Sequence, residues 1–173
     1  MGGTPSESVE WIEVSLAVNV ARGSALDTSV KDHVLLVVTA MVNGTCVPAL
    51  VDSGASRSFI GDRFHSKPPL YFVSAYSALE LANGETIVST GIAPNVLIAI
   101  GGAQSQISLT VVPMMEGVQI ILGRDWLDMV NPLIDWKTNS LVLRCGNKLE
   151  VVAGVSSNTA QCKIRDRGLS GLQ

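Results

Sequence analysis

An apolar, strand-like run ends in an aspartate within the segment Ala49–Ile60, which reads ALVDSGASRSFI. A carboxylate at the end of a buried strand is costly unless its charge is paired or hydrogen-bonded, so its position there needs a chemical reason. Ser53 and Gly54 follow Asp52; glycine permits a tight turn, and the serine hydroxyl can hold a neighbouring backbone group. These residues predict a turn that presents the Asp52 carboxylate rigidly, as acid–base chemistry requires.

A second feature follows in Ile120–Leu127 (IILGRDWL), where apolar residues lead through a glycine into a helix. We expect this helix over Arg124–Val130, because Asn131-Pro132 disfavours its continuation. Asp125 in its first turn is expected to stabilise the positive end of the helix dipole. The sequence therefore offers one carboxylate at a strand end and one short helix later in the chain.

The elements that must position these features are mostly strands. Apolar runs typical of strands cover Ile12–Val20, His33–Val42, Thr45–Val51, Asn95–Ile100, Gln106–Val112 and Val118–Leu122. Hairpin turns are expected at Asn43-Gly44, Asn83-Gly84, Gly101-Gly102 and Gly146-Asn147, with Gly91 as a flexible point between two hairpins. Short strands, repeated hairpins and one helix predict an all-β barrel or sandwich with a small helical addition.

Composition restricts the classes of function. The 173 residues suit one domain with tails, and the net charge of -3 argues against a nucleic-acid partner, which needs a basic face. No apolar stretch approaches the roughly 18 residues of a membrane span, so no membrane partner is expected. Three widely spaced cysteines and two histidines argue against a zinc site or a disulfide framework, and they fit a reducing compartment.

Two motifs together resemble those of the retropepsin family, the single-lobe aspartic proteases of retroviruses and LTR retrotransposons. They are Asp52–Ala55 (DSGA) and Ile121–Gly123 (ILG). The longer segments ALVDSGASRSFI and IILGRDWLDMVNPLIDWKTNSLVL are similar to the proteases of gypsy-type LTR retrotransposon polyproteins and of genes domesticated from them. The resemblance covers residues 11–153, which leaves 1–10 as a flexible leader and 154–173 as a flexible tail or linker.

The resemblance implies a small closed β-barrel of the retropepsin type, with one short C-terminal helix, that is active as a two-fold dimer. The chain has only one Asp-Ser-Gly, so a homodimer would bring Asp52 and its copy together across the axis. Two carboxylates a few ångströms apart share one proton, an effect for which aspartic proteases are the known example. The ionised carboxylate then activates a water, and Ser53 and Gly54 hold the turn. No metal and no cofactor are implied.

The resemblance also assigns substrate-binding residues. The hairpin around Asn83-Gly84 corresponds to the flap, which closes over an extended peptide that binds as an added strand. Asn83, Gly84 and Glu85 at its tip, and Ala55 beside the catalytic turn, are the expected substrate contacts.

Three residues at the start of the helix are expected to be structural. Gly123, Arg124 and Asp125 open the helix, and by the resemblance Arg124 ties it to the turn after Asp52. The acidic residue that this arginine commonly meets is replaced here by Ser56. Its partner would then be Asp62, unless it has none.

The leading hypothesis is an aspartic endopeptidase that processes polyprotein junctions as a homodimer, in the cytoplasm or within a retroelement particle. Two alternatives remain open. One is a non-catalytic dimerisation or peptide-binding module derived from a retroelement protease. The other is a ubiquitin-linked cytosolic protease with the same domain.

Overall fold

The structure is a computed structural model that describes residues 13–14, 35–81, 83–114 and 118–155. The leader 1–10, most of the tail 154–173 and most of the strand expected at Ile12–Val20 lie outside these residues. From that strand the structure describes β1 (Glu13–Val14), which pairs in parallel with the end of β5 (Val73–Leu81). The proposed limits of the domain therefore stay a prediction.

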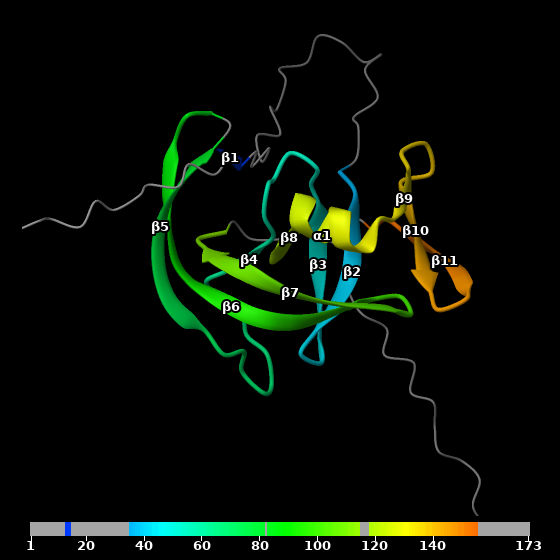
Figure 1. Cartoon of the computed structure of the whole chain (residues 1–173), viewed down its shortest axis with the longest axis horizontal. Helices are drawn as coiled ribbons and strands as arrows, with labels where there is room; N and C mark the ends of the chain where they lie inside the picture. Colours follow the sequence, from blue (N-terminus) through cyan, green and yellow to red (C-terminus); the bar gives the residue numbers. More distant parts are fainter. Residues whose placement is uncertain (1–12, 15–34, 82, 115–117, 156–173) are drawn as a thin grey trace, which may run out of the picture.

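Six strands close into a barrel, which confirms the expected all-β fold (Figure 1). They follow one another around the ring in the order β6-β2-β3-β8-β4-β7, and β7 pairs back onto β6. Their bounds are β2 (Val37–Val42), β3 (Thr45–Val51), β4 (Phe59–Gly61), β6 (Thr86–Ile100), β7 (Ala103–Val112) and β8 (Ile120–Leu122). Parallel pairing of β3 with β8, and of β4 with β7, closes the ring between segments that are distant in sequence.

All four expected hairpin turns are present, and their backbone explains their residue types. Between β2 and β3, Asn43 and Gly44 both have positive φ, at 49° and 78°. This is the conformation in which an Asn-Gly pair matches the twist of the two strands it joins. Gly84, Gly101 and Gly146 also have positive φ in the turns of the other three hairpins.

β6 differs from the expectation of two separate strands with Gly91 as a flexible point between them. It is one strand of 15 residues that pairs with β5 along its first half and with β7 along most of its length. Asn95, with φ of 52°, lies in a register shift against β7. Gly91 is a site of close approach, because a Cβ there would lie 2.8 Å from the Val73 carbonyl oxygen.

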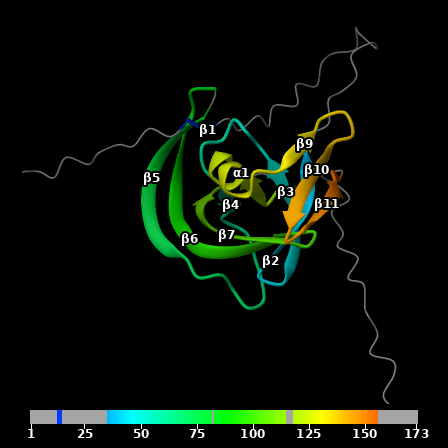
Figure 2. The same cartoon turned by 45° about the vertical axis from the view of Figure 1, so that its right-hand side comes forward.

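The chain after the barrel forms a helix and a second sheet. Helix α1 spans Arg124–Val130 as expected, and Asn131 caps its C-terminus in the left-handed conformation. A three-stranded sheet follows beside the barrel, in the order β11-β10-β9 (Figure 2). Its strands are β9 (Leu133–Asp135), β10 (Ser140–Cys145) and β11 (Lys148–Ala153). The hairpin of β10 and β11 was expected, whereas β9 and β4 are too short for their alternation to be recognised in the sequence.

Two apolar clusters form the core. The larger one fills the barrel and includes Trp126, which is 1% exposed. The smaller one lies against the turn that follows β3 and includes Ala55 and Leu79, both at 0% exposure. Leu79 belongs to β5, so this cluster joins the β5–β6 hairpin to the catalytic turn expected from the sequence.

The spacing of the cysteines argued against disulfide bonds, but Cys46 is disulfide-bonded. Cys145 is a free thiol. In the part of the chain that the structure describes, no helix has the length and apolar character needed to cross a membrane.

Candidate active site

Asp52 follows β3 directly, at the point where this strand runs beside β8. Val51 pairs with Leu122, and the Asp52 N–H donates to the Leu122 carbonyl at 3.0 Å. The next residue after Leu122 is Gly123, the N-cap of helix α1. The two motifs found in the sequence, the Asp-Ser-Gly turn and the Ile-Leu-Gly segment, are therefore neighbours in the fold.

The Asp52 carboxyl is held by its own turn and is partly withdrawn from water. Its Oδ1 accepts the Gly54 N–H at 2.9 Å, and the main-chain carbonyl of Asp52 accepts the Ala55 N–H at 3.3 Å. Burial raises the pKa of Asp52, and the hydrogen bonds from Gly54 and Ala55 lower it by less, so the net shift is upward. A carboxyl with this environment retains its proton to higher pH than a solvated aspartate does.

Gly123 lies in backbone contact with the loop after Asp52. A Cβ at this position would lie 2.2 Å from the Arg57 carbonyl oxygen and 2.8 Å from that of Ala55. Only glycine allows the two segments to approach this closely. The structural role expected for Gly123 follows from this geometry.

Arg124 contacts the loop with its backbone and not with its side chain. Its N–H donates to the Ala55 carbonyl at 2.7 Å. Its guanidinium pairs with Asp128 one turn along the helix, at 2.8 Å between Nε and Oδ1, and both side chains are 63% exposed. The expectation of Asp62 as its partner is therefore wrong.

Asp125 makes the side-chain link that the sequence analysis assigned to Arg124. Its carboxylate accepts the Ser58 hydroxyl at 2.6 Å, the Ser58 N–H at 3.0 Å and the Trp126 N–H at 2.7 Å. Ser58 is 0% exposed, and its hydroxyl also accepts the Gly123 N–H at 3.0 Å. Sequence reasoning missed Ser58, because a serine just before a strand shows nothing of a partner so distant along the chain.

The described residues at the tip of the β5–β6 hairpin are joined by two hydrogen bonds. Glu85 N–H donates to Asn83 Oδ1 at 3.0 Å, and Gly84 N–H donates to the Leu81 carbonyl at 2.8 Å. All three tip residues proposed to bind substrate, Asn83, Gly84 and Glu85, are exposed. None of the hydrogen bonds described for these three residues involves Asp52. Ala55 is 0% exposed and shares an apolar cluster with Leu79, which pairs with Ile87 close to the tip of this hairpin.

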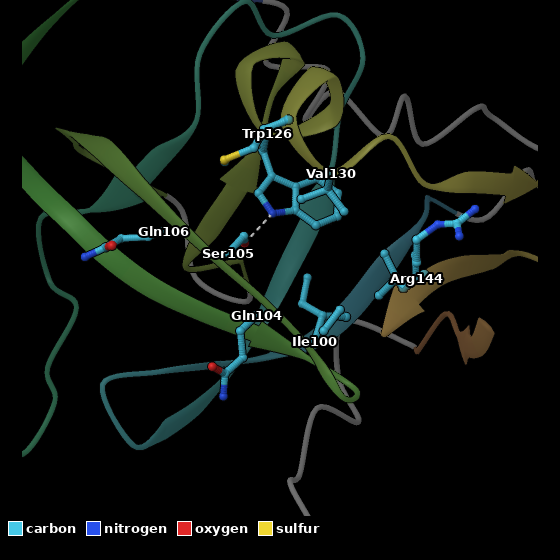
Figure 3. Close-up of a pocket in the computed structure, with 10 residues that line it drawn as sticks. Ile100, Gln104, Ser105, Gln106, Trp126, Val130 and Arg144 are labelled. Carbon is cyan, nitrogen blue, oxygen red and sulfur yellow. Dashed lines mark hydrogen bonds between the residues drawn. The ribbon is translucent and has the colours of Figure 1, made fainter. Parts of the chain in front are cut away.

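A cavity of about 480 Å³ lies between β7, α1 and β10, away from the Asp52 turn (Figure 3). Its walls include Trp126 and Val130 from the helix, together with Ile100, Leu143 and Arg144. Trp126 Nε1–H points to Ser105 on β7 and donates to its hydroxyl at 3.0 Å (Figure 3). This bond, together with the burial of the indole, fixes α1 against the barrel.

Among the described residues, no group of three histidine, cysteine or carboxylate side chains is placed to hold a metal ion. The chemistry that the described turn can perform is that of a positioned carboxyl group.

The sequence matches a family model described as "PEG10/RTL1 protease domain" over residues 48–148, which is more than half of the chain. No curated protein matches it significantly. Among solved structures, it is similar to the retroviral protease-like domain of Ddi1 from Leishmania major. The two are 19% identical with a TM-score of 0.50, and the match covers 72% of this chain and 97% of that one. At this identity the likeness concerns the fold alone, which is retropepsin-like.

Proposed function

Because the chain belongs to the PEG10/RTL1 protease domain family and has a retropepsin-like fold, we propose that it is an aspartic endopeptidase with Asp52 as its catalytic carboxyl. The observation that carries this proposal is the environment of Asp52. Its carboxyl lies at the end of β3, partly buried, with a pKa raised by that burial and with Gly54 N–H holding one oxygen. Ser53 and Gly54 complete the turn.

The proposal requires a second copy of the chain. The sequence holds a single Asp-Ser-Gly, so one chain supplies one of the two carboxyls that the reaction needs. The tip of the β5–β6 hairpin, the turn after β3 and the loop between β9 and β10 lie on the same side of the molecule in both views (Figures 1 and 2). A two-fold axis through this side brings the two Asp52 residues together in a homodimer.

Proton sharing then supplies the chemistry. Two adjacent carboxyls cannot both ionise, so one keeps a proton while the other accepts a proton from a water held between them. That water attacks the scissile carbonyl carbon, and the protonated carboxyl donates to the carbonyl oxygen. The raised pKa of Asp52 in the single chain already favours retention of this proton.

The substrate proposed is an extended peptide, such as a junction in a polyprotein. The β5–β6 hairpin acts as the flap, with Asn83, Gly84 and Glu85 at its exposed tip. Ala55, 0% exposed in the single chain, supports the floor from within the core and does not present its side chain to the substrate. An extended segment between flap and floor gains main-chain hydrogen bonds as an added strand does. Leu79, which pairs with Ile87 close to the tip of the hairpin, belongs to the same apolar cluster as Ala55, and this link between the flap and the catalytic turn supports the assignment.

Cleavage of a peptide library by the full chain and by Asp52→Asn tests the proposal. We expect the parent to cleave and Asp52→Asn to be inactive with an unchanged fold. Asp62→Asn is the matched control, because Asp62 is an exposed aspartate directly after β4, and it should cleave like the parent. An Asp52→Asn protein as active as the parent would refute the proposal. A folded parent that binds peptides without cleaving them would indicate a non-catalytic module.

A further inference from the structure

Ser58 is a buried hydroxyl that connects two segments of the candidate site. It accepts the Gly123 N–H and donates to Asp125 Oδ1, while its own N–H donates to Asp125 Oδ2. Hydrogen bonds to an ionised acceptor are about twice as strong as neutral ones, and a carboxylate that takes both donors of one residue fixes its orientation as well. Ser58 is thus locked to the start of helix α1 by three bonds.

The same two segments meet along their backbones on either side of Ser58. Asp52 N–H donates to Leu122 at 3.0 Å, and Arg124 N–H donates to Ala55 at 2.7 Å. Between these bonds, the backbone of Gly123 lies against the Arg57 carbonyl, because glycine has no Cβ to prevent this approach. Residues 52–58 therefore lie against residues 122–125 as one bonded unit.

This unit is anchored to the barrel at both ends. The Ser58 carbonyl accepts the Thr110 N–H from β7 at 3.1 Å. Trp126, whose N–H donates to Asp125, places its indole in the barrel core and donates to Ser105, also on β7. A displacement of the loop would have to break contacts with the helix and with β7 together.

From this arrangement we propose that Ser58 and Asp125 are positioning residues that hold the Asp52 turn in its catalytic geometry. They do not touch substrate; they act by fixing residues 52–58 relative to helix α1. The exposed pair of Arg124 and Asp128 lies outward and does not contribute to this lock. The inference rests on the proposed function for its kinetic consequence, whereas the lock itself is testable without activity.

Ser58→Ala removes the hydroxyl and leaves the Gly123 N–H without its acceptor. We expect kcat to fall by about tenfold to a hundredfold with little change in KM, because a small misplacement of a catalytic group has this effect. Ser58→Thr keeps a hydroxyl and should restore most of kcat. Ser140→Ala is the matched control, because Ser140 is also buried and its hydroxyl bonds Thr138 at 2.8 Å in the second sheet. It should lower the melting temperature and leave kcat unchanged.

A second measurement is amide hydrogen exchange at Asp52 and Arg124, whose N–H groups bridge the two segments. In Ser58→Ala both amides should exchange faster than the loss of global stability explains, and in Ser140→Ala they should follow global stability. If Ser58→Ala does not fold, Asp125→Asn gives the same test with a smaller change.

The outcomes separate the two proposals. Parental kcat and parental exchange in Ser58→Ala overturn the positioning role. An equal loss of kcat in Ser58→Ala and Ser140→Ala, at equal loss of melting temperature, also overturns it, since the effect is then one of stability. An inactive parent overturns the proposed function. The exchange rates of the Asp52 and Arg124 amides then test by themselves whether Ser58 holds the two segments together.

Discussion

The Asp52 N–H donates to the Leu122 carbonyl at 3.0 Å, and this bond joins the two sequence motifs of the protein. It exists because β3 and β8 run parallel, so both strands end at the same edge of the barrel. The carboxyl at the end of one strand thereby meets the helix that begins after the other. The geometry of Asp52 consequently depends on residues of the second motif.

Gly123→Ala should be among the most damaging small substitutions in the chain. The new Cβ would lie 2.2 Å from the Arg57 carbonyl oxygen, so backbone must shift. Overpacking of this kind costs about 1–3 kcal/mol of unfolding free energy, measurable by chemical denaturation. Gly146→Ala is the control: Gly146 has positive φ but open space around it, so only about 1 kcal/mol of backbone strain is expected. Equal losses in the two variants would contradict this account.

Arg124→Ala should have almost no effect. Its guanidinium pairs only with Asp128 among the described residues, and an exposed pair at i and i+4 contributes about 0.5 kcal/mol or less. Thermal unfolding and peptide cleavage should match the parent, and Asp128→Ala should behave in the same way. A loss of stability as large as that of Gly123→Ala would show that the arginine side chain ties the helix to the loop after all.

Local chemistry explains why much of the fold was predictable. Asn43-Gly44 and Gly84 adopt positive φ because few other residue types do so at low cost, so the hairpins follow from residue type. The end of helix α1 follows equally from Asn131-Pro132.

The rest depends on tertiary pairing, which no local pattern contains. β4 has three residues, and its identity as a strand comes from β7 and β8 on either side. Ser58 acquires its role from Asp125, a residue far along the chain. The resemblance implies that Arg124 ties the helix to the loop after Asp52, whereas its actual partner, Asp128, lies at the ordinary helical spacing.

Asp52→Asn should stabilise the folded chain near neutral pH. The pKa of Asp52 is raised in the folded state, so the folded protein binds more protons than the unfolded one between the two pKa values. Stability therefore falls as pH rises through this range, and the loss persists at neutral pH. Asparagine cannot ionise and avoids this loss while keeping an acceptor for Gly54 N–H. The melting temperature of dilute protein should exceed that of the parent near neutral pH, and the difference should disappear in acid. If the melting temperature of Asp52→Asn exceeds that of the parent by more in acid than at neutral pH, the folded state lowers the pKa of Asp52.

Trp136→Ala should weaken the proposed homodimer. Trp136 follows β9 in the loop that lies on the same side of the molecule as the Asp52 turn, and its side chain is 65% exposed (Figures 1 and 2). Large aromatic side chains left in water often supply much of the binding energy of an interface. Sedimentation should show more monomer in the variant, and specific activity should fall at low protein concentration and recover at high concentration.

The control for this prediction is Leu97→Ala, because Leu97 is an exposed apolar residue on β6, 51% accessible, and it lines a separate pocket beside the β2–β3 turn. It should sediment and cleave like the parent. If Trp136→Ala remains dimeric with the parental dissociation constant, the β9–β10 loop is not part of the interface. If the parent itself cleaves peptides at concentrations where it is entirely monomeric, Asp52 does not need its copy, and the two-fold site is wrong.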